Sequence, residues 1–358
     1  MSAHGYRQRG ALDTTDEART RHGQGDDVAT IYDVARQAGV SAATVSRVLN
    51  GHVKVDPTLA ERVMAAVSQL GYRRNAVARN LRTSRTSLWA VIISDVENPF
   101  FTSMVRGIED VASAAGYSVV LCNSDENPDK ESSYIAAALS EQMAGVVISP
   151  SSNQVDDVNL LLEAGCPVVV IDRELDNVTA DTVLVDNEHG AELATTHPVE
   201  QGNTHIACIT GPQWLSSATQ RFDGYARALS KAGQSVDETL VRYADFREQG
   251  GYDAMASLLD DGPAPDAVFA TNNLMTIGAM ECLVQRGLSV PDDVAIVGFD
   301  SIPWADLIRP TLTTVAQPTY EVGRRAAQLL TKRAESPDAE PERVVLPTSL
   351  QVRASSTR

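Results

Sequence analysis

Hydrogen-bonding and aromatic side chains gather at the ends of apolar segments in this sequence, where they could bind a small polar molecule. Carboxylate, guanidinium and amide groups accept or donate hydrogen bonds, and phenylalanine rings can cover the apolar faces of a ligand. Each residue alone has a structural alternative, because asparagines cap helices, phenylalanines fill cores, and neighbouring acids and arginines form surface ion pairs. The candidates are Asn98, Phe100, Phe101, Asp172, Arg173, Arg221, Phe246, Asn272, Asp300 and Gln317.

Catalytic and metal chemistry is a weaker interpretation of the same residues. The acids of the set occur with arginines, and none of the six histidines belongs to it, although His189 lies near the end of an apolar segment. The four cysteines show no CxxC spacing and are expected to be buried, reduced thiols rather than metal ligands. Neither GxGxxG after the first apolar run nor a phosphate-binding P-loop occurs, so we expect no nucleotide cofactor.

Alternating apolar and amphipathic segments must position these side chains. The runs "LWAVIIS", "YSVVLCN", "GVVISP" and "PVVVID" predict buried parallel strands, and a second series consists of "HIACITG", "DAVFAT" and "VAIVGFD". Helices are predicted between them over residues 101–115, 128–142, 155–164, 217–232, 249–259 and 273–286. This alternation predicts two doubly wound α/β sheets, and therefore two lobes, with a ligand cleft at the carboxyl ends of the strands.

The distribution of charge separates a basic segment from an acidic body. The 358 residues carry a formal net charge of −17, yet residues 29–88 hold nine lysines and arginines against three acids. The residues after Leu88 hold 17 lysines and arginines against 39 acids. This asymmetry indicates an anionic partner for the basic segment alone, with a solvated basic surface as the alternative.

The first 28 residues are polar and glycine-rich, and we expect them to form a disordered tail rather than a secretory signal. No run of 18 or more apolar residues occurs, so no transmembrane helix is predicted. Together with the cysteine pattern, these features predict a cytoplasmic protein without a membrane partner.

Three short helices are predicted in the basic segment. Thr30 can cap a helix over residues 31–38 that Gly39 ends, Ser41 can cap a second over 42–49, and a third fits 57–70. A helix, a short glycine-containing turn and a second helix form the helix-turn-helix motif, whose second helix enters the major groove of DNA. Arg47 is then the best candidate to contact guanine, with a surface ion pair as the alternative.

The other DNA contacts follow from the same placement. Ala42, Ala43 and Ser46 would face base edges, and Ser41 and Thr44 would contact phosphates or cap the helix. Thr30, Asn50 and Tyr72 complete the DNA-binding residues predicted for this unit.

The segments "DVARQAGVSAATVSRVLNG" and "LGYRRNAVARNLRTSRT" closely resemble the LacI family of bacterial repressors. The resemblance implies that "NAVARNL" is a hinge helix in the minor groove, with Leu81 wedged between base pairs and Ala78 packed against the partner's hinge helix. Asn75 would cap this helix, and Arg82 would contact DNA. So short a helix should order only when two copies and DNA are present. Arg74 stands where the family usually has proline.

Residues 89–350 resemble the periplasmic sugar-binding fold of LacI-family effector domains, and the bacterial ribose-binding proteins in particular. Their ligand contacts are the asparagine and both phenylalanines of "NPFF", an Asp-Arg pair, and a further Arg, Phe, Asn, Asp and Gln, all of which recur in the candidate set. The resemblance implies D-ribose as the ligand, with a nucleoside or another pentose as alternatives. Two acids against two arginines leave the site near neutral, which disfavours a sugar phosphate.

These features predict a ligand-responsive repressor that binds a pseudo-palindromic operator as a homodimer and releases it when ribose draws the lobes together. A transport sugar-binding protein and a sugar-processing enzyme are the rival classes. The expected organisation is a tail (1–28), a helix-turn-helix domain (29–74), a hinge helix and linker (75–86) and a two-lobed domain (87–352). Lobe one should comprise about 87–187 and 318–338, and lobe two about 188–317 and 339–352. Pro198, where the family commonly has leucine, should kink or shorten its helix.

Overall fold

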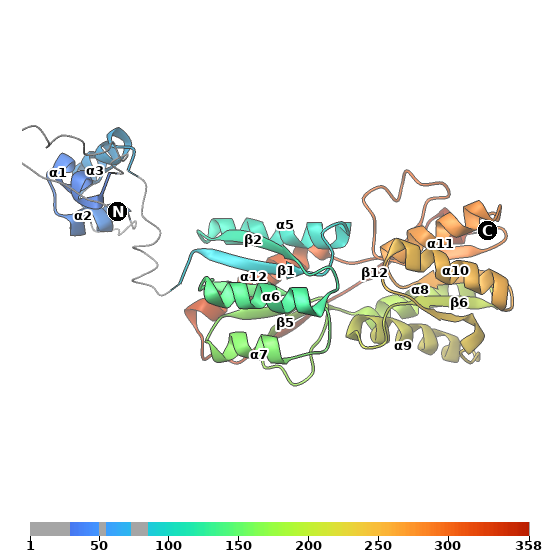
Figure 1. The fold of residues 1–358 in the computed structure, drawn as a ribbon. Helices are drawn as coiled ribbons and strands as arrows, with labels where there is room; N and C mark the ends of the chain where they lie inside the picture. Colours follow the sequence, from blue (N-terminus) through green and yellow to red (C-terminus); the bar gives the residue numbers. More distant parts are fainter. Residues whose placement is uncertain (1–28, 50–54, 73–84, 358) are drawn as a thin grey trace, which may run out of the picture. The chain divides into compact units, whose positions relative to one another are not determined.

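The computed structural model describes residues 29–49, 55–72 and 85–357, and the chain divides into two units, residues 1–79 and 80–358 (Figure 1). The predicted tail, the whole predicted hinge helix "NAVARNL", Arg74 and the DNA contacts Asn50, Asn75, Ala78, Leu81 and Arg82 lie outside the described residues. Within the described ranges, no helix is long and apolar enough to cross a membrane.

The first unit contains the three predicted helices, α1 (Ile31–Ala38), α2 (Ala42–Leu49) and α3 (Pro57–Gln69). Thr30 and Asp33 cap α1 reciprocally, since each side chain accepts a hydrogen bond from the other residue's backbone N–H. Gly39 ends α1 with φ at 64°, a left-handed conformation that costs glycine little. Ser41 accepts from the Thr44 N–H at the start of α2, so its predicted capping role is confirmed.

A small apolar core joins these helices. Val34, Ala38, Val45, Val63 and Ala66 are buried in it, and each helix contributes at least one of them. Helices of this length are marginal in isolation, so α3 is required to cover the surface that α1 and α2 share. The helix-turn-helix geometry therefore depends on a core of very few side chains.

Lobe one of the second unit is a six-stranded parallel sheet between two layers of helices (Figure 1). The strand order is β11-β5-β4-β3-β1-β2. Alternate residues of β1 face opposite layers, so that Trp89 and Val91 pack against α5 and α12, whereas Ala90 and Ile92 pack against α6 and α7. The elements are β1 (Leu88–Ile93), α5 (Pro99–Ala114), β2 (Ser118–Asn123), α6 (Pro128–Ser140), β3 (Gly145–Ile148), α7 (Asp156–Glu163), β4 (Val168–Ile171), β5 (Asp181–Val185), α12 (Thr319–Glu335) and β11 (Arg343–Leu346).

Lobe two repeats this plan with the strand order β12-β10-β9-β8-β6-β7, in which only β12 is antiparallel to its neighbour. Ile209 of β6 faces α10 and α11, whereas Cys208 faces α8 and α9. All four cysteines are free and buried, as expected. The elements are α8 (Asn187–Glu200), β6 (Ile206–Thr210), α9 (Ser216–Lys231), η1 (Glu238–Leu240), β7 (Val241–Tyr243), α10 (Glu248–Asp261), β8 (Ala267–Ala270), α11 (Asn273–Gln285), β9 (Ala295–Phe299), β10 (Thr313–Ala316), β12 (Ser349–Gln351) and η2 (Ala354–Ser356).

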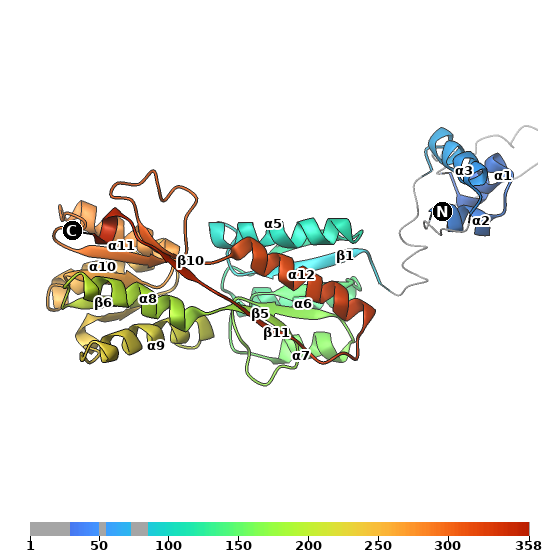
Figure 2. The same ribbon diagram turned by 180° about the vertical axis from the view of Figure 1, so that it is seen from behind.

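The chain crosses between the lobes three times, after β5, after β10 and after β11 (Figure 2). The prediction that residues 339–352 belong to lobe two is wrong for β11, which pairs with β5 of lobe one. Val344 and Leu346 pack against the core beneath α5 and α12, and this burial places the strand in the first sheet. Only β12 returns to lobe two.

Helix α8 contains Pro198, and the kink or shortening expected there stays a prediction. The helix includes this proline as its third-last residue and ends at Glu200, so the proline does not end it. The backbone oxygen of Pro198 accepts hydrogen bonds from the Asn203 main chain and side chain.

Close packing of α5 on α12 in lobe one depends on glycine. A Cβ atom added to Gly107 would lie 2.2 Å from the backbone oxygen of Tyr320, which cannot move without displacing α12. We expect Gly107→Ala to lower the free energy of unfolding by about 2 kcal/mol, although alanine is the better helix former. Urea titration would measure this, with exposed Ser113→Ala on the same helix as control. Equal or greater stability of Gly107→Ala would contradict the close approach.

Candidate functional site

The candidate DNA-contacting residues differ in how much of their surface is available. Arg47 and Ala43 on α2 are exposed. Ala42 packs against the core of the first unit, which we call the head, and Tyr72 lies partly buried on the same core. Ser46 is partly buried. Of the base contacts predicted from sequence, Arg47 and Ala43 are thus the best presented, while Ala42 and Tyr72 have a structural role in this unit.

The candidate ligand-binding residues lie around one pocket in the cleft between the two lobes. Residues of both lobes line this pocket, and it is partly open to solvent. Nine of the ten candidates line it, and Gln317 lies behind it, donating a hydrogen bond to Asp300. Four further lining residues, Asp95, Glu126, Ser217 and Arg247, were missed in the sequence. We call this set of residues the cleft pocket.

Unusual backbone conformations hold three of these side chains. Asp172 follows β4, Asp300 follows β9 and Phe246 follows β7, with φ angles of 67°, 72° and 63°. Left-handed backbone is uncommon for residues other than glycine and persists only where surrounding contacts enforce it. All three residues line the cleft pocket, although they come from the ends of strands in two different sheets.

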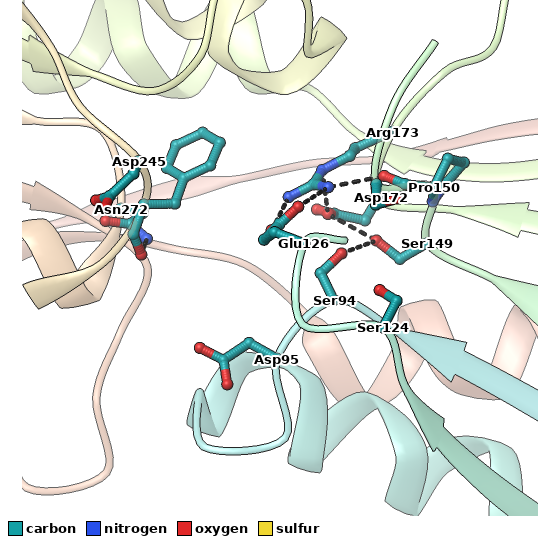
Figure 3. A network of polar contacts seen from close by, with 12 residues as sticks. Ser94, Asp95, Ser124, Glu126, Ser149, Pro150, Asp172, Arg173, Asp245 and Asn272 are labelled. Atoms are coloured by element: carbon teal, nitrogen blue, oxygen red, sulfur yellow. Dashed lines mark hydrogen bonds and ion pairs between the residues drawn. The ribbon is translucent and has the colours of Figure 1, made fainter. Parts of the chain in front are cut away.

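Arg173 is the centre of the lobe-one side of the pocket (Figure 3). Its two terminal nitrogens donate to the Glu126 carboxylate at 2.7 and 2.6 Å, and one of them also donates to the backbone oxygen of Pro150 at 2.7 Å. Its Nε lies 3.5 Å from the Asp172 carboxylate, which accepts from the Ser149 hydroxyl. Burial alone would lower the pKa of Arg173, but the Glu126 carboxylate raises it overall.

Arg221 and Asp300 form the corresponding pair on lobe two, with 3.9 Å between Nη1 and Oδ2. Arg221 also donates to Asn187 at 2.8 Å and to the Thr271 backbone oxygen at 2.7 Å, and its guanidinium lies 4.0 Å from the centre of the Phe299 ring. Burial raises the pKa of Asp300 despite the nearby Arg221, and burial also raises that of Asp172. A ligand that donates hydrogen bonds to these carboxylates would offset their loss of water.

Asn98 and Asn272 cap the helices that follow them, which was the structural alternative given for them from sequence. Asn98 accepts from the Phe100 N–H at the start of α5 and from the Asn273 side chain of lobe two. Asn272 accepts from the Met275 N–H and donates to the Phe246 backbone oxygen, so both of its polar groups are engaged. Both residues therefore fix the walls of the pocket.

Arg247 connects the lobes across the mouth of the cleft pocket. It follows Phe246 in lobe two and pairs with Asp95 at 2.6 Å and Asp125 at 2.8 Å, both in lobe one. A second contact between the lobes joins the Glu174 N–H to the Ser216 hydroxyl at 2.8 Å. The one sequence signal for the missed acids was their place after strand ends, in "ISDVEN" and "CNSDEN".

The charge of the lining differs from the expected balance of two acids and two arginines. Asp95, Glu126, Asp172 and Asp300 stand against Arg173, Arg221 and Arg247. The pocket is therefore net negative by one charge when all seven groups are ionised, and it favours a neutral or cationic ligand. Among the described residues, no group of three or more His, Cys, Asp or Glu side chains could hold a metal ion.

Glu131 of α6 is buried, and its carboxylate accepts a hydrogen bond from the Ser151 N–H at 2.7 Å. Burial raises its pKa to about 7. Because this value exceeds that of the unfolded chain, the carboxyl contributes stability that is fully present at pH 4 and lost as the pH rises through 7.

Glutamine at this position cannot ionise, so Glu131→Gln should gain stability relative to the wild type as the pH rises. We expect the difference in free energy of unfolding to change by about 3 kcal/mol between pH 4 and pH 8. Urea titrations across this range would measure it, with Glu141→Gln at the end of the same helix as control. Parallel pH profiles for wild type and Glu131→Gln would rule out the buried carboxyl as the cause.

Comparison with known proteins places both units. Residues 30–75 match the family of bacterial regulatory proteins described as lacI, and residues 195–356 match a periplasmic binding protein-like domain. The chain is 38% identical to the ribose operon repressor of Halalkalibacterium halodurans over 91% of this chain and 97% of that protein. It is 35% identical to catabolite control protein A of Priestia megaterium over 91% and 99%.

Solved structures that are similar to this chain are also of transcription regulators. The transcriptional regulator CelR in complex with cellobiose is 37% identical over 91% of this chain and 99% of that chain, with a TM-score of 0.69. The Lac repressor dimer bound to operator and the anti-inducer ONPF is 28% identical over 92% and 99%, with a TM-score of 0.80. A LacI family regulator from Enterococcus faecium with bound ribose is 32% identical over 75% and 98%, with a TM-score of 0.69.

These relatives are transcription regulators and not enzymes, which confirms the expected class. With more than a third of its residues shared over nine-tenths of its length, the chain belongs to the LacI family of bacterial regulatory proteins.

Proposed function

We propose that this regulator represses transcription in the cytoplasm by binding a pseudo-palindromic operator as a homodimer, and that D-ribose in the cleft pocket is its inducer. The observation that carries the effector assignment is that nine of the ten residues expected for a ribose site line one pocket, with the tenth bonded to Asp300. The relatives named for the ribose operon, and the Enterococcus faecium regulator with bound ribose, support the same choice.

The chemistry of the pocket suits a small neutral molecule with several hydroxyl groups. Asp172 and Asp300 are buried acceptors on opposite lobes, and sugar hydroxyls would donate to them. The Phe100, Phe101 and Phe246 rings would cover the apolar faces of the sugar. Within the described structure, Nε of Arg173 and Oε1 of Gln317 are buried without a hydrogen-bond partner, and a hydroxyl group could serve either.

Two other ligands remain as alternatives within the family. A nucleoside shares the pentose and would need additional space for its base. A disaccharide has a precedent in the CelR–cellobiose complex, and it is larger again. The pocket opens to solvent, so a ligand larger than one sugar ring could extend out of it. Binding measurements with ribose, a nucleoside and a disaccharide therefore distinguish these ligands.

Regulation would operate through the crossings between the lobes. A ligand that binds residues of both lobes favours their closed arrangement, and the three crossings are where the backbone can bend. We propose that closure changes the pairing of two subunits, separates their hinge helices and lowers affinity for the operator. The energy available for this is the difference in ribose affinity between the two arrangements.

Calorimetric titration with D-ribose tests the effector. We expect selective binding of ribose over arabinose, xylose, 2-deoxyribose and uridine, because buried polar groups left without partners penalise each analogue. Asp172→Asn should bind ribose about 10- to 100-fold more weakly, since asparagine tolerates the left-handed backbone but loses the charged acceptor. Exposed Asp292→Asn is the matched control. Uridine binding without ribose binding would replace ribose by a nucleoside as effector.

Operator binding tests the role of the head. With an operator selected from random DNA by the purified protein, Arg47→Ala should lose about 1–3 kcal/mol of binding and relax specificity at one base pair in each half-site. Arg36→Ala removes the same charge from α1 and should weaken binding to all sequences alike. A uniform loss for Arg47→Ala would instead make Arg47 a phosphate contact. Ribose should weaken operator binding, and tighter binding with ribose would reverse the proposed sign.

A further inference from the structure

The turn after β2 places two acids in the cleft with fixed directions. Asp125 and Glu126 have φ angles of 60° and 56°, so two successive residues other than glycine adopt left-handed backbone. The Glu126 N–H donates to the backbone oxygen of Ser94, which ties the turn to the end of β1. We call Asp125 and Glu126 the acidic turn. Such strain persists only where other contacts outweigh it, and here those contacts are with arginines.

Glu126 occupies the terminal nitrogens of Arg173 (Figure 3). The pair is bidentate, and this is the geometry in which a guanidinium binds a carboxylate or a phosphate most strongly. Pro150 accepts a further hydrogen bond from the same guanidinium. An anionic group that entered the pocket would have to displace the Glu126 carboxylate or lie beside it.

The other two arginines of the pocket also lie beside carboxylates, although neither pair is bidentate. Arg247 pairs with Asp95 and with Asp125 of the acidic turn, and Arg221 lies beside Asp300 while donating to a backbone oxygen. Each arginine of the lining therefore faces a carboxylate of this chain. The Arg173 side chain is only 5% exposed, so its pairing with Glu126 takes place out of bulk water, where replacement of a partner is costly.

We propose that Glu126 is a specificity-determining residue that keeps phosphorylated sugars and other anions out of the cleft pocket by holding Arg173. This rests on the proposed function only in that the pocket takes a small-molecule effector. Loss of the Glu126 charge leaves the terminal nitrogens of Arg173 without a carboxylate, while Asp172 still lies 3.5 Å from its Nε, and a phosphate group can take the place of Glu126. Glu126→Gln should thus convert an anion-rejecting pocket into one that accepts inorganic phosphate.

Thermal unfolding of the full chain with inorganic phosphate tests this directly. At constant ionic strength, with chloride as the reference anion, we expect the melting midpoint of Glu126→Gln to rise with the logarithm of phosphate concentration, by about 3 °C at about ten times the dissociation constant. Wild type should show no such rise. Neither should Glu126→Asp, which keeps the charge, nor Glu97→Gln, which removes an exposed acid near the pocket.

A phosphate-dependent rise in wild type equal to that of Glu126→Gln, or no rise in the variant, would overturn the proposal. Should Glu126→Gln fail to unfold cooperatively, titration of wild type with D-ribose 5-phosphate decides instead, since binding as tight as that of D-ribose removes any need for an excluding residue. If wild type does not bind D-ribose, ribose is rejected as the effector. The comparison of wild type with Glu126→Gln in inorganic phosphate still tests the role of Glu126.

Discussion

The structure of the cleft pocket depends on the pairing of its buried charges, because a charged side chain removed from water needs a partner of opposite charge. Seven ionisable side chains line it, and its three arginines each contact at least one acid from this chain. Burying an unpaired charge would cost several kcal/mol, so the positions of these acids are fixed as strictly as those of the arginines. The strained backbone at Asp172, Asp300 and the acidic turn is a consequence, because it brings the carboxylates within reach of the guanidinium groups.

The same pairing shapes the contact between the lobes. Arg247 reaches from lobe two to Asp95 and Asp125 of lobe one, while the Asn98–Asn273 hydrogen bond lies deeper in the cleft. Ion pairs at a partly exposed mouth are individually weak. The main chain passes between the lobes at three points, and the permanent connection is therefore provided by backbone rather than by side chains.

Much of this arrangement was predictable from sequence, and the exceptions have physical causes. Among the described residues, long apolar runs and capped amphipathic segments predicted α1 to α3 and seven of the twelve strands. They also predicted six of the seven helices α5 to α11, and missed α8 and α12. The strands that escaped prediction have three to five residues, and β11 exposes alternate residues, so hydrophobic pattern alone could not assign it to a lobe. Nine pocket residues were recognised by resemblance, whereas Glu126 and Arg247 were missed. Their importance lies in partners distant in sequence, which no local pattern reveals.

The late return of the chain to both sheets has a consequence for biosynthesis. Lobe one lacks its edge strand until β11 is made, and lobe two lacks β12 until a few residues later, while Ser356 still has to reach His197. The three helices of the head, by contrast, are complete by Gln69 and share a core of their own. The three-helix unit can therefore fold during synthesis long before either lobe can complete its sheet. Chains that stall near their end would carry a folded three-helix unit joined to two lobes with incomplete sheets, whose unpaired edges invite aggregation or proteolysis.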